Sequence, residues 1–195
     1  MHDGVIATLN VQVRTIRAPG HDPVLSTIKL AADQGILKAG LILSRDTSDE
    51  GIPYTDLSQV LGTGTGSTKN YSGTIAGSPL EPGSIVVTDG VETFTDDALG
   101  NLIGDAGGTG TAIYKNGSVS VAFDVAVTNT TEIIVTSNSE VAGVLDRDVD
   151  TTKSVDGVTI IHGTVKEDEL LKGSTPVACV AADFKLLRKK GVYPV

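Results

Sequence analysis

Short runs of alternating apolar and polar residues, separated by glycine, asparagine and aspartate, recur along the chain. The clearest is SVSVAF at 118–123, whose period of two is that of a strand with one buried face. KNG at 115–117 is a tight-turn signal between this run and TAIY at 111–114, so we predict a hairpin there. Residues 95–110 are expected to form a long, turn-rich loop. With further strand candidates at 83–90, 91–96 and 131–138, residues 62–137 form a predicted all-β module.

The sequences on either side of this module have a different pattern. We expect two strands within 25–46, two more at 141–150 and 154–165, and a short helix within 165–171. PVACVAADFKLLRKKG at 176–191 predicts the main helix, followed by a closing strand GVYPV. Its apolar residues have helical spacing, cations occupy the last turn, and Gly191 supplies the stop. The predicted apolar face is Val177, Val180, Ala181, Phe184 and Leu187.

Two glycine-containing stretches divide the chain. VIATLNVQVRTI at 5–16 has the pattern of a strand, but APGHDP at 18–23 isolates it, so we expect no strand partner for it within its own chain. LGTGTGSTKN at 61–70 predicts a flexible linker. It is not a phosphate-binding loop, because Ser67 stands where G-x-G-x-x-G requires glycine and Lys69 does not follow a glycine.

Composition favours a structural protein. The chain has 195 residues, of which 39% are hydrophobic but only 4% aromatic, with 23 glycines and no tryptophan. This composition is common in β-rich structural modules, whereas enzyme pockets usually contain aromatic side chains and converging polar groups. The single cysteine, Cys179, excludes an internal disulfide, and its apolar surroundings predict a small core residue.

The charge limits the possible partners. The net charge is −9, and residues 62–137 contain two lysines against eight carboxylates, so we expect no nucleic-acid partner. No apolar stretch approaches the roughly 20 residues that a membrane helix needs, so we expect no membrane partner either. The first residues lack the basic and apolar segments of a signal peptide, which predicts a soluble protein made in the cytoplasm.

Two groups of carboxylates were considered as metal sites. Asp146, Asp148 and Asp150 begin like a calcium loop, but Thr151 and Gly157 occupy the positions that require glycine and glutamate. A solvated strand edge explains their spacing of two without a metal. A second group, in the predicted loop, is a better ion candidate: Asp96, Asp97, Asn101 and Asp105.

No catalytic motif is evident. His2, His21 and His162 are scattered, none lies within four residues of another histidine or a cysteine, and no G-x-S-x-G sequence marks a nucleophile. We therefore expect no enzymatic activity, no cofactor and no metal.

The two flanks resemble the lambda-type head decoration proteins of tailed phages. The resemblance rests on short motifs that occur in the same order as in that family. They are His21-Asp22-Pro23, Leu37-Lys38-Ala39-Gly40, Ala142-Gly143-Val144-Leu145 with Asp148-Val149-Asp150, and the end of the final helix from Leu186 to Val192.

The resemblance implies a domain plan and a function. It implies an N-terminal capsid-binding arm (1–24), a decoration-protein scaffold (25–61 and 138–195) and an inserted β domain (62–137). The implied fold is mainly β with one or two short helices: a small β-tulip-like α+β fold interrupted by a sandwich-like all-β insert. The implied protein is a homotrimer on the capsid exterior of the virion, where it stabilises the head against the pressure of packaged DNA.

The arm would add a strand to the major capsid protein, which is a common mode of protein recognition. The residues expected to make this contact are Val5, Ile6, Leu9, Val11 and Val13. Two alternatives stay open: a tail or fibre protein whose insert binds a host-surface glycan, and an intracellular enzyme on an unfamiliar β scaffold.

Overall fold

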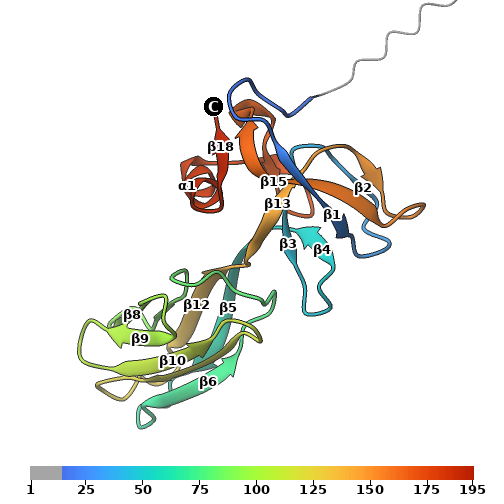
Figure 1. Ribbon diagram of the computed structural model, residues 1–195. Helices are drawn as coiled ribbons and strands as arrows, with labels where there is room; N and C mark the ends of the chain where they lie inside the picture. The colour runs from blue at the N-terminus through green and yellow to red at the C-terminus, as the bar shows by residue number, and fades with distance from the viewer. Residues whose placement is uncertain (1–14) are drawn as a thin grey trace, which may run out of the picture.

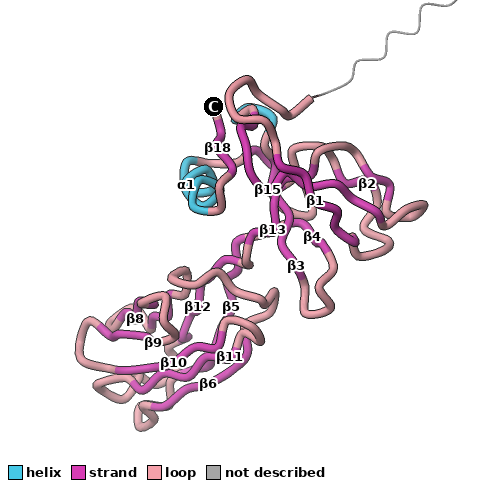
Figure 2. Tube along the Cα trace, in the orientation of Figure 1, coloured by secondary structure: helices cyan, strands magenta, loops and turns pink. Residues whose placement is uncertain are grey.

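The computed structural model describes residues 15–195. These residues are mainly β with one α-helix, which confirms the predicted fold class at that level. Most strands belong to two sheets that occupy separate parts of the molecule (Figures 1 and 2). We call residues 15–55 and 139–195 the scaffold, and residues 56–138 the barrel.

The scaffold is built on a six-stranded sheet in the order β1-β15-β13-β3-β4, with β18 also paired to β15. All neighbours are antiparallel except β18, which runs parallel to β15. Leu30, just after β1, forms a parallel bridge with Gly51 in β4, so the sheet curls back toward its own first strand. The strands are β1 (Val24–Lys29), β3 (Ile42–Arg45), β4 (Gly51–Pro53), β13 (Val141–Leu145), β15 (Asp156–Val165) and β18 (Val192–Pro194).

Shorter elements complete the scaffold. Two small ladders pair β2 (Ile36–Leu37) with β14 (Val149–Asp150) and β16 (Leu171–Lys172) with β17 (Val177–Ala178). The 3₁₀ turn η1 (Glu167–Glu169) precedes β16, and the helix α1 (Ala181–Lys189) precedes β18. Two apolar clusters fill the scaffold, one including Ile42, Tyr54 and Leu187 and the other including Leu30, Leu43 and Leu145.

The barrel is an eight-stranded antiparallel sheet in the order β5-β12-β7-β8-β9-β10-β11-β6. Its end strands, β5 and β6, are joined by a side chain: the Gln59 amide donates to the Thr74 carbonyl (2.9 Å) and accepts from the Ala76 N–H (3.0 Å). These two bonds nearly close the sheet on itself. The strands are β5 (Asp56–Thr63), β6 (Asn70–Thr74), β7 (Val86–Thr88), β8 (Thr93–Asp96), β9 (Asn101–Gly104), β10 (Thr109–Ile113), β11 (Ser118–Ala122) and β12 (Glu132–Asn138).

The barrel has its own apolar core. Phe94 and Phe123 meet edge to face with ring centroids 4.9 Å apart, and Val119 and Val121 of β11 point into the same core. The predicted hairpin is confirmed, because β10 pairs with β11 across residues 114–117. No residue of this core belongs to either scaffold cluster. The barrel and the scaffold are therefore packed independently.

The prediction of a long loop at 95–110 was wrong, because this stretch contains β9 and the start of β10. Its glycines suggested a loop, but they make room for a buried carboxylate. Glu92 is 3% exposed and accepts hydrogen bonds from the N–H groups of Gly108 (2.6 Å) and Asp124 (2.8 Å). A Cβ on Gly104 or Gly108 would overlap Glu92 Oε1.

The predicted linker at 61–70 is instead the connection between two strands, because its first three residues belong to β5 and Asn70 begins β6. The boundary drawn between residues 61 and 62 falls inside β5. This strand pairs with β12 from Asp56↔Asn138 to Thr63↔Glu132, so residues 56–61 belong to the barrel sheet. Their alternating pattern fits a strand in either unit, and only the pairing decides between them.

The predicted helix at 176–191 is shorter in the structure. Val177 lies in β17, and α1 begins at Ala181, where the Val180 N–H donates to Asp183 Oδ2 (2.8 Å). Val177 and Val180 are about half exposed, whereas Leu187 is buried, so only the later part of the predicted apolar face packs inward. The short helix predicted within 165–171 is the 3₁₀ turn η1 in the structure, and the predicted closing strand is β18.

Deleting the barrel should leave a folded scaffold. We expect replacement of residues 57–137 by a short Gly/Ser linker to cost the scaffold about 1 kcal/mol or less, since loop closure depends only weakly on length and the cores are separate. Denaturant unfolding followed by circular dichroism would measure this cost. An unfolded deletion variant would show instead that the scaffold needs the barrel to fold.

Candidate functional site

The residues predicted to bind a capsid lie outside the described part of the chain. Val5, Ile6, Leu9, Val11 and Val13 all precede residue 15. Their function stays a prediction, and the structure bears on it only through the residues that follow them. We call residues 16–18 the arm root.

The arm root is attached to the end of β15 as a short additional strand. Ile16 is fully buried in the scaffold core, and Arg17 forms an antiparallel bridge with Val165. The Ala18 N–H donates to the Thr164 carbonyl (3.1 Å), and the Lys166 N–H donates to the Ile16 carbonyl (2.9 Å). The expectation that residues 5–16 have no partner in their own chain was therefore wrong at Ile16.

A charge-assisted pair strengthens this attachment. Arg17 donates through Nε to Asp146 Oδ1 (2.8 Å) and through Nη2 to Asp146 Oδ2 (2.7 Å). The Asp146 side chain is only 7% exposed, and its hydrogen bond raises the pKa of Arg17. This two-pronged geometry is the strong form of an arginine–carboxylate contact. The ion pair thus connects the arm root to Asp146, which follows β13 and lies 129 positions away in the sequence.

The other two aspartates have partners of their own. Asp148 accepts from Lys38 Nζ and from the Ala39 N–H (both 2.8 Å). Lys153 and Thr152 hold the pKa of Asp150 at about 2. The three carboxylates do not converge. Because β13 ends at Leu145, before all three of them, the expectation that they share one strand face was wrong. Asp146, moreover, is buried rather than solvated.

The carboxylates considered as the better ion candidate stabilise turns. Asp96 accepts from Gly83 N–H and Tyr114 OH, Asp97 accepts from Leu99 N–H and Asn101, and Asp105 accepts from Thr93 N–H. The hydrogen bond from the Asn101 side chain is the main reason that the pKa of Asp97 is lowered. Across residues 15–195, no three His, Cys, Asp or Glu side chains are grouped so as to hold a metal.

The structure brings together two histidines that are far apart in sequence. The rings of His21, His162 and Tyr193 lie next to the arm root, with centroids 5.8 to 6.2 Å apart. Val24 and Val195, on the neighbouring strand and at the C-terminus, are 51% and 66% exposed. Aromatic and apolar side chains of this kind are typical of the centre of protein interfaces. Sequence spacing alone gave no sign of this grouping.

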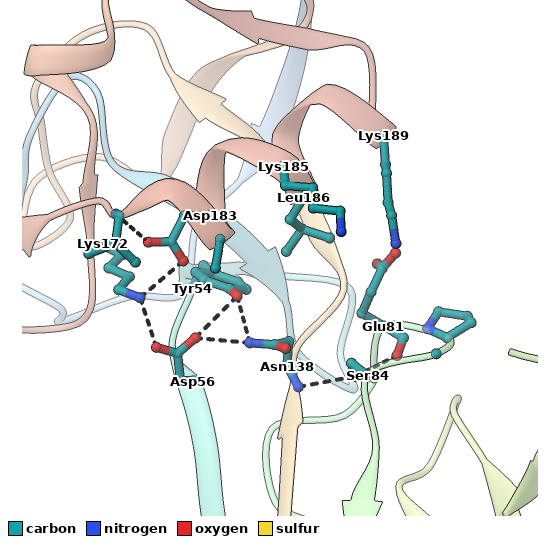
Figure 3. A pocket seen from close by; sticks show the side chains of 14 residues that line it. Tyr54, Asp56, Glu81, Ser84, Asn138, Lys172, Asp183, Lys185, Leu186 and Lys189 are labelled. Carbon is teal, nitrogen blue, oxygen red and sulfur yellow. Dashed lines mark hydrogen bonds and ion pairs between the residues drawn. The ribbon is translucent and has the colours of Figure 1, made fainter. Parts of the chain in front are cut away.

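A group of interacting polar side chains lies where the barrel joins the scaffold (Figure 3). A cavity of about 260 Å³ separates α1 from the barrel there. On one side of it, the Tyr54 hydroxyl donates to Asp56 (3.3 Å) and accepts from the Asn138 amide (2.7 Å). Burial is the main reason that the pKa of Tyr54 is raised, so the hydroxyl keeps its proton. Lys172 and Asp183 complete the group.

Cys179 lies close to this group. Burial, followed by the nearby Asp183 carboxylate, raises the pKa of its thiol to about 12. A thiol with that pKa is a poor nucleophile at neutral pH. Cys179 packs against the scaffold core but is only partly buried, so the prediction of a core residue is right about its apolar contacts and not about full burial.

Comparison with family models, curated proteins and solved structures gave no match for this chain. Among residues 15–195 there is no helix with the length and apolar character needed to cross a membrane.

Replacing Arg17 by Ala should loosen the arm root. We expect the free energy of unfolding to fall by about 1 kcal/mol. The value is modest because the Arg17 side chain is 42% exposed and its charge is partly screened. Amide hydrogen exchange at Ala18 and Lys166 should accelerate, since both N–H groups bond across the root.

Arg147→Ala is the matched control, because Arg147 contacts the same carboxylate at 3.9 Å and is more exposed. Equal acceleration in the two variants would show that the Arg17–Asp146 pair does not fix the root.

Proposed function

We propose that the protein is a capsid decoration protein of a tailed phage, which binds the assembled head as a homotrimer and stabilises it against internal DNA pressure. It acts at three-fold positions on the outside of the capsid. The proposal begins from the resemblance of the flanking segments and is supported by how those segments pack.

The observation that carries the proposal is that the resembling motifs contact one another. Val149 of one motif pairs with Leu37 of another, and Asp148 accepts hydrogen bonds from Lys38 and Ala39. The Gly40 N–H donates to the Leu145 carbonyl (2.8 Å). Motifs separated by about 100 residues thus form one structural unit. Between these motifs the chain leaves the scaffold, forms the barrel and returns, and no barrel strand belongs to the scaffold sheet.

Two further features fit this function. The strand-patterned segment 5–16 meets the scaffold at a root held by the buried Ile16 and the Arg17–Asp146 ion pair, which suits a segment that binds another protein. The root and the barrel lie at opposite ends of the molecule (Figure 1). A scaffold seated by its root would therefore present the barrel away from the shell.

The glycan-binding alternative has less support from the barrel. Its aromatic residues pack in or against its core: Tyr71, Phe94, Tyr114 and Phe123. Its exposed apolar residues are aliphatic instead, including Val91, Leu99 and Val125. The aromatic rings of the barrel thus pack into or against its core and do not form an exposed surface on which a sugar could stack.

The chain should be a trimer in solution. Light scattering at micromolar concentration should give about three times the 20.0 kDa chain mass. The physical basis is that a stable interface buries upward of about 1,000 Å² and requires exposed apolar surface, which the scaffold has around Val24 and Tyr193. A monomer mass would count heavily against the proposal.

Removal of residues 1–14 should abolish binding to expanded, undecorated heads while leaving the trimer and the scaffold intact. Strand addition by the arm supplies the main contact, and three arms on one trimer bind together with high avidity. Sedimentation of heads with the truncated protein measures this. Val91→Ser in the barrel, an exposed position far from the root, is the control and should bind normally. Undiminished binding by the truncated protein would refute the function of the arm.

A further inference from the structure

The barrel is connected to the scaffold by only two chain crossings, at residues 53–56 and 138–141. They lie side by side, since Asp56 and Asn138 are partners in the ladder of β5 and β12. No apolar core spans the junction, because the barrel cluster and the two scaffold clusters share no residue. The returning crossing is bonded to the barrel loop as far as Glu140, whose N–H donates to the Pro79 carbonyl (2.8 Å). Beyond these backbone bonds, the orientation of the barrel on the scaffold depends on side-chain contacts beside the crossings.

Lys172 of β16 makes the first of these contacts. Its ammonium lies 2.8 Å from Asp56 Oδ2 at the start of the barrel and 3.0 Å from Asp183 Oδ1 in the first turn of α1. The Lys172 side chain is 14% exposed and that of Asp183 only 3%. Burial by itself would lower the pKa of Lys172, but the hydrogen bonds to the two carboxylates raise it. The ammonium therefore stays charged.

Lys190, at the other end of α1, makes the second contact. Its ammonium lies 3.0 Å from Glu81 Oε2, in the barrel loop before β7, and 3.4 Å from Glu140 Oε1, in the returning crossing. The Glu81 side chain is 11% exposed. Burial lowers the pKa of Lys190, whereas Glu81 and Glu140 raise it, with a net increase. One lysine near each end of α1 thus forms an ion pair with a barrel carboxylate, Lys172 with Asp56 and Lys190 with Glu81.

We propose that Lys172 and Lys190 form an ionic clamp that fixes the barrel in one orientation on the scaffold. Without the clamp, the barrel reorients about the 53–56 and 138–141 crossings. The cavity between α1 and the barrel leaves space for this motion. The barrel is therefore held in a defined direction by two ion pairs, Lys172–Asp56 and Lys190–Glu81, and it does not hang from a flexible tether. This inference does not depend on the proposed capsid function.

Two lysines in the same cavity provide a matched control. Lys185 and Lys189, one turn apart on α1, line the cavity but have no ion-pair partner within residues 15–195 (Figure 3). Lys172→Met with Lys190→Met removes both clamp charges and keeps the side-chain length. Lys185→Met with Lys189→Met removes the same number of charges from the same cavity.

Residual dipolar couplings and ¹⁵N relaxation of the full chain test the clamp. In the native protein and the control variant, barrel and scaffold amides should fit one alignment tensor and one correlation time. In the clamp variant they should require two tensors, with a shorter correlation time for the barrel. The chemical shifts of core amides such as those of Phe94 and Leu43 should be unchanged.

Further variants complete the test. Lys172→Arg with Lys190→Arg should keep a single tensor, because the charges remain. One tensor in the clamp variant, or two in the control variant, would overturn the proposal. If the clamp variant does not fold, Asp56→Asn with Glu81→Gln removes the barrel charges of the same two ion pairs with little change in side-chain size. Two tensors in this variant support the clamp, and a single tensor refutes it.

Discussion

The pairing of β5 with β12 is the constraint on which the organisation of the whole chain depends. Asp56 and Asn138 are ladder partners at its base, so the chain leaves the scaffold and returns at the same place. The eight barrel strands can then satisfy their hydrogen bonds among themselves, and the scaffold sheet can close without them. Because Asn138 also bonds to Tyr54 and Asp56, the same position joins the ladder to the polar group at the junction.

Three buried carboxylates stabilise particular features of this acidic chain. Asp146 fixes the arm root, Glu92 fills space between two glycines, and Asp183 serves both the helix N-terminus and Lys172. Each is buried and has charged or N–H partners, which is the condition under which a carboxylate is tolerated inside a protein. The acidic composition thus reflects internal bonding as well as solvation.

Local patterns predicted the local structure well. The 111–123 hairpin followed from a turn signal between two alternating runs, and the closing strand and mainly β class followed from similar patterns. The glycines in 95–110 led to the wrong prediction of a loop. They leave space for the Glu92 side chain, which lies more than ten positions away in the sequence. The start of α1 was misplaced for a comparable reason: the helix was predicted from residue 176, whereas Asp183 accepts from the Val180 N–H and α1 begins at Ala181. The residues of the candidate site were harder still to predict from the sequence. Arg17 and Asp146 are 129 positions apart, and Lys172 and Asp56 are 116 apart, so no spacing rule joins them.

The separation of the barrel core from the two scaffold clusters has a consequence for how the protein denatures. The barrel and the scaffold each pair their own strands and pack their own apolar side chains, so the chain is expected to unfold in two transitions and not as a single two-state system. Calorimetry would record two heat-absorption peaks, each with an enthalpy set by the size of its own unit. A mutation in the barrel core would move one peak and leave the other almost in place. A substitution that loosens one core is therefore expected to leave the other packed.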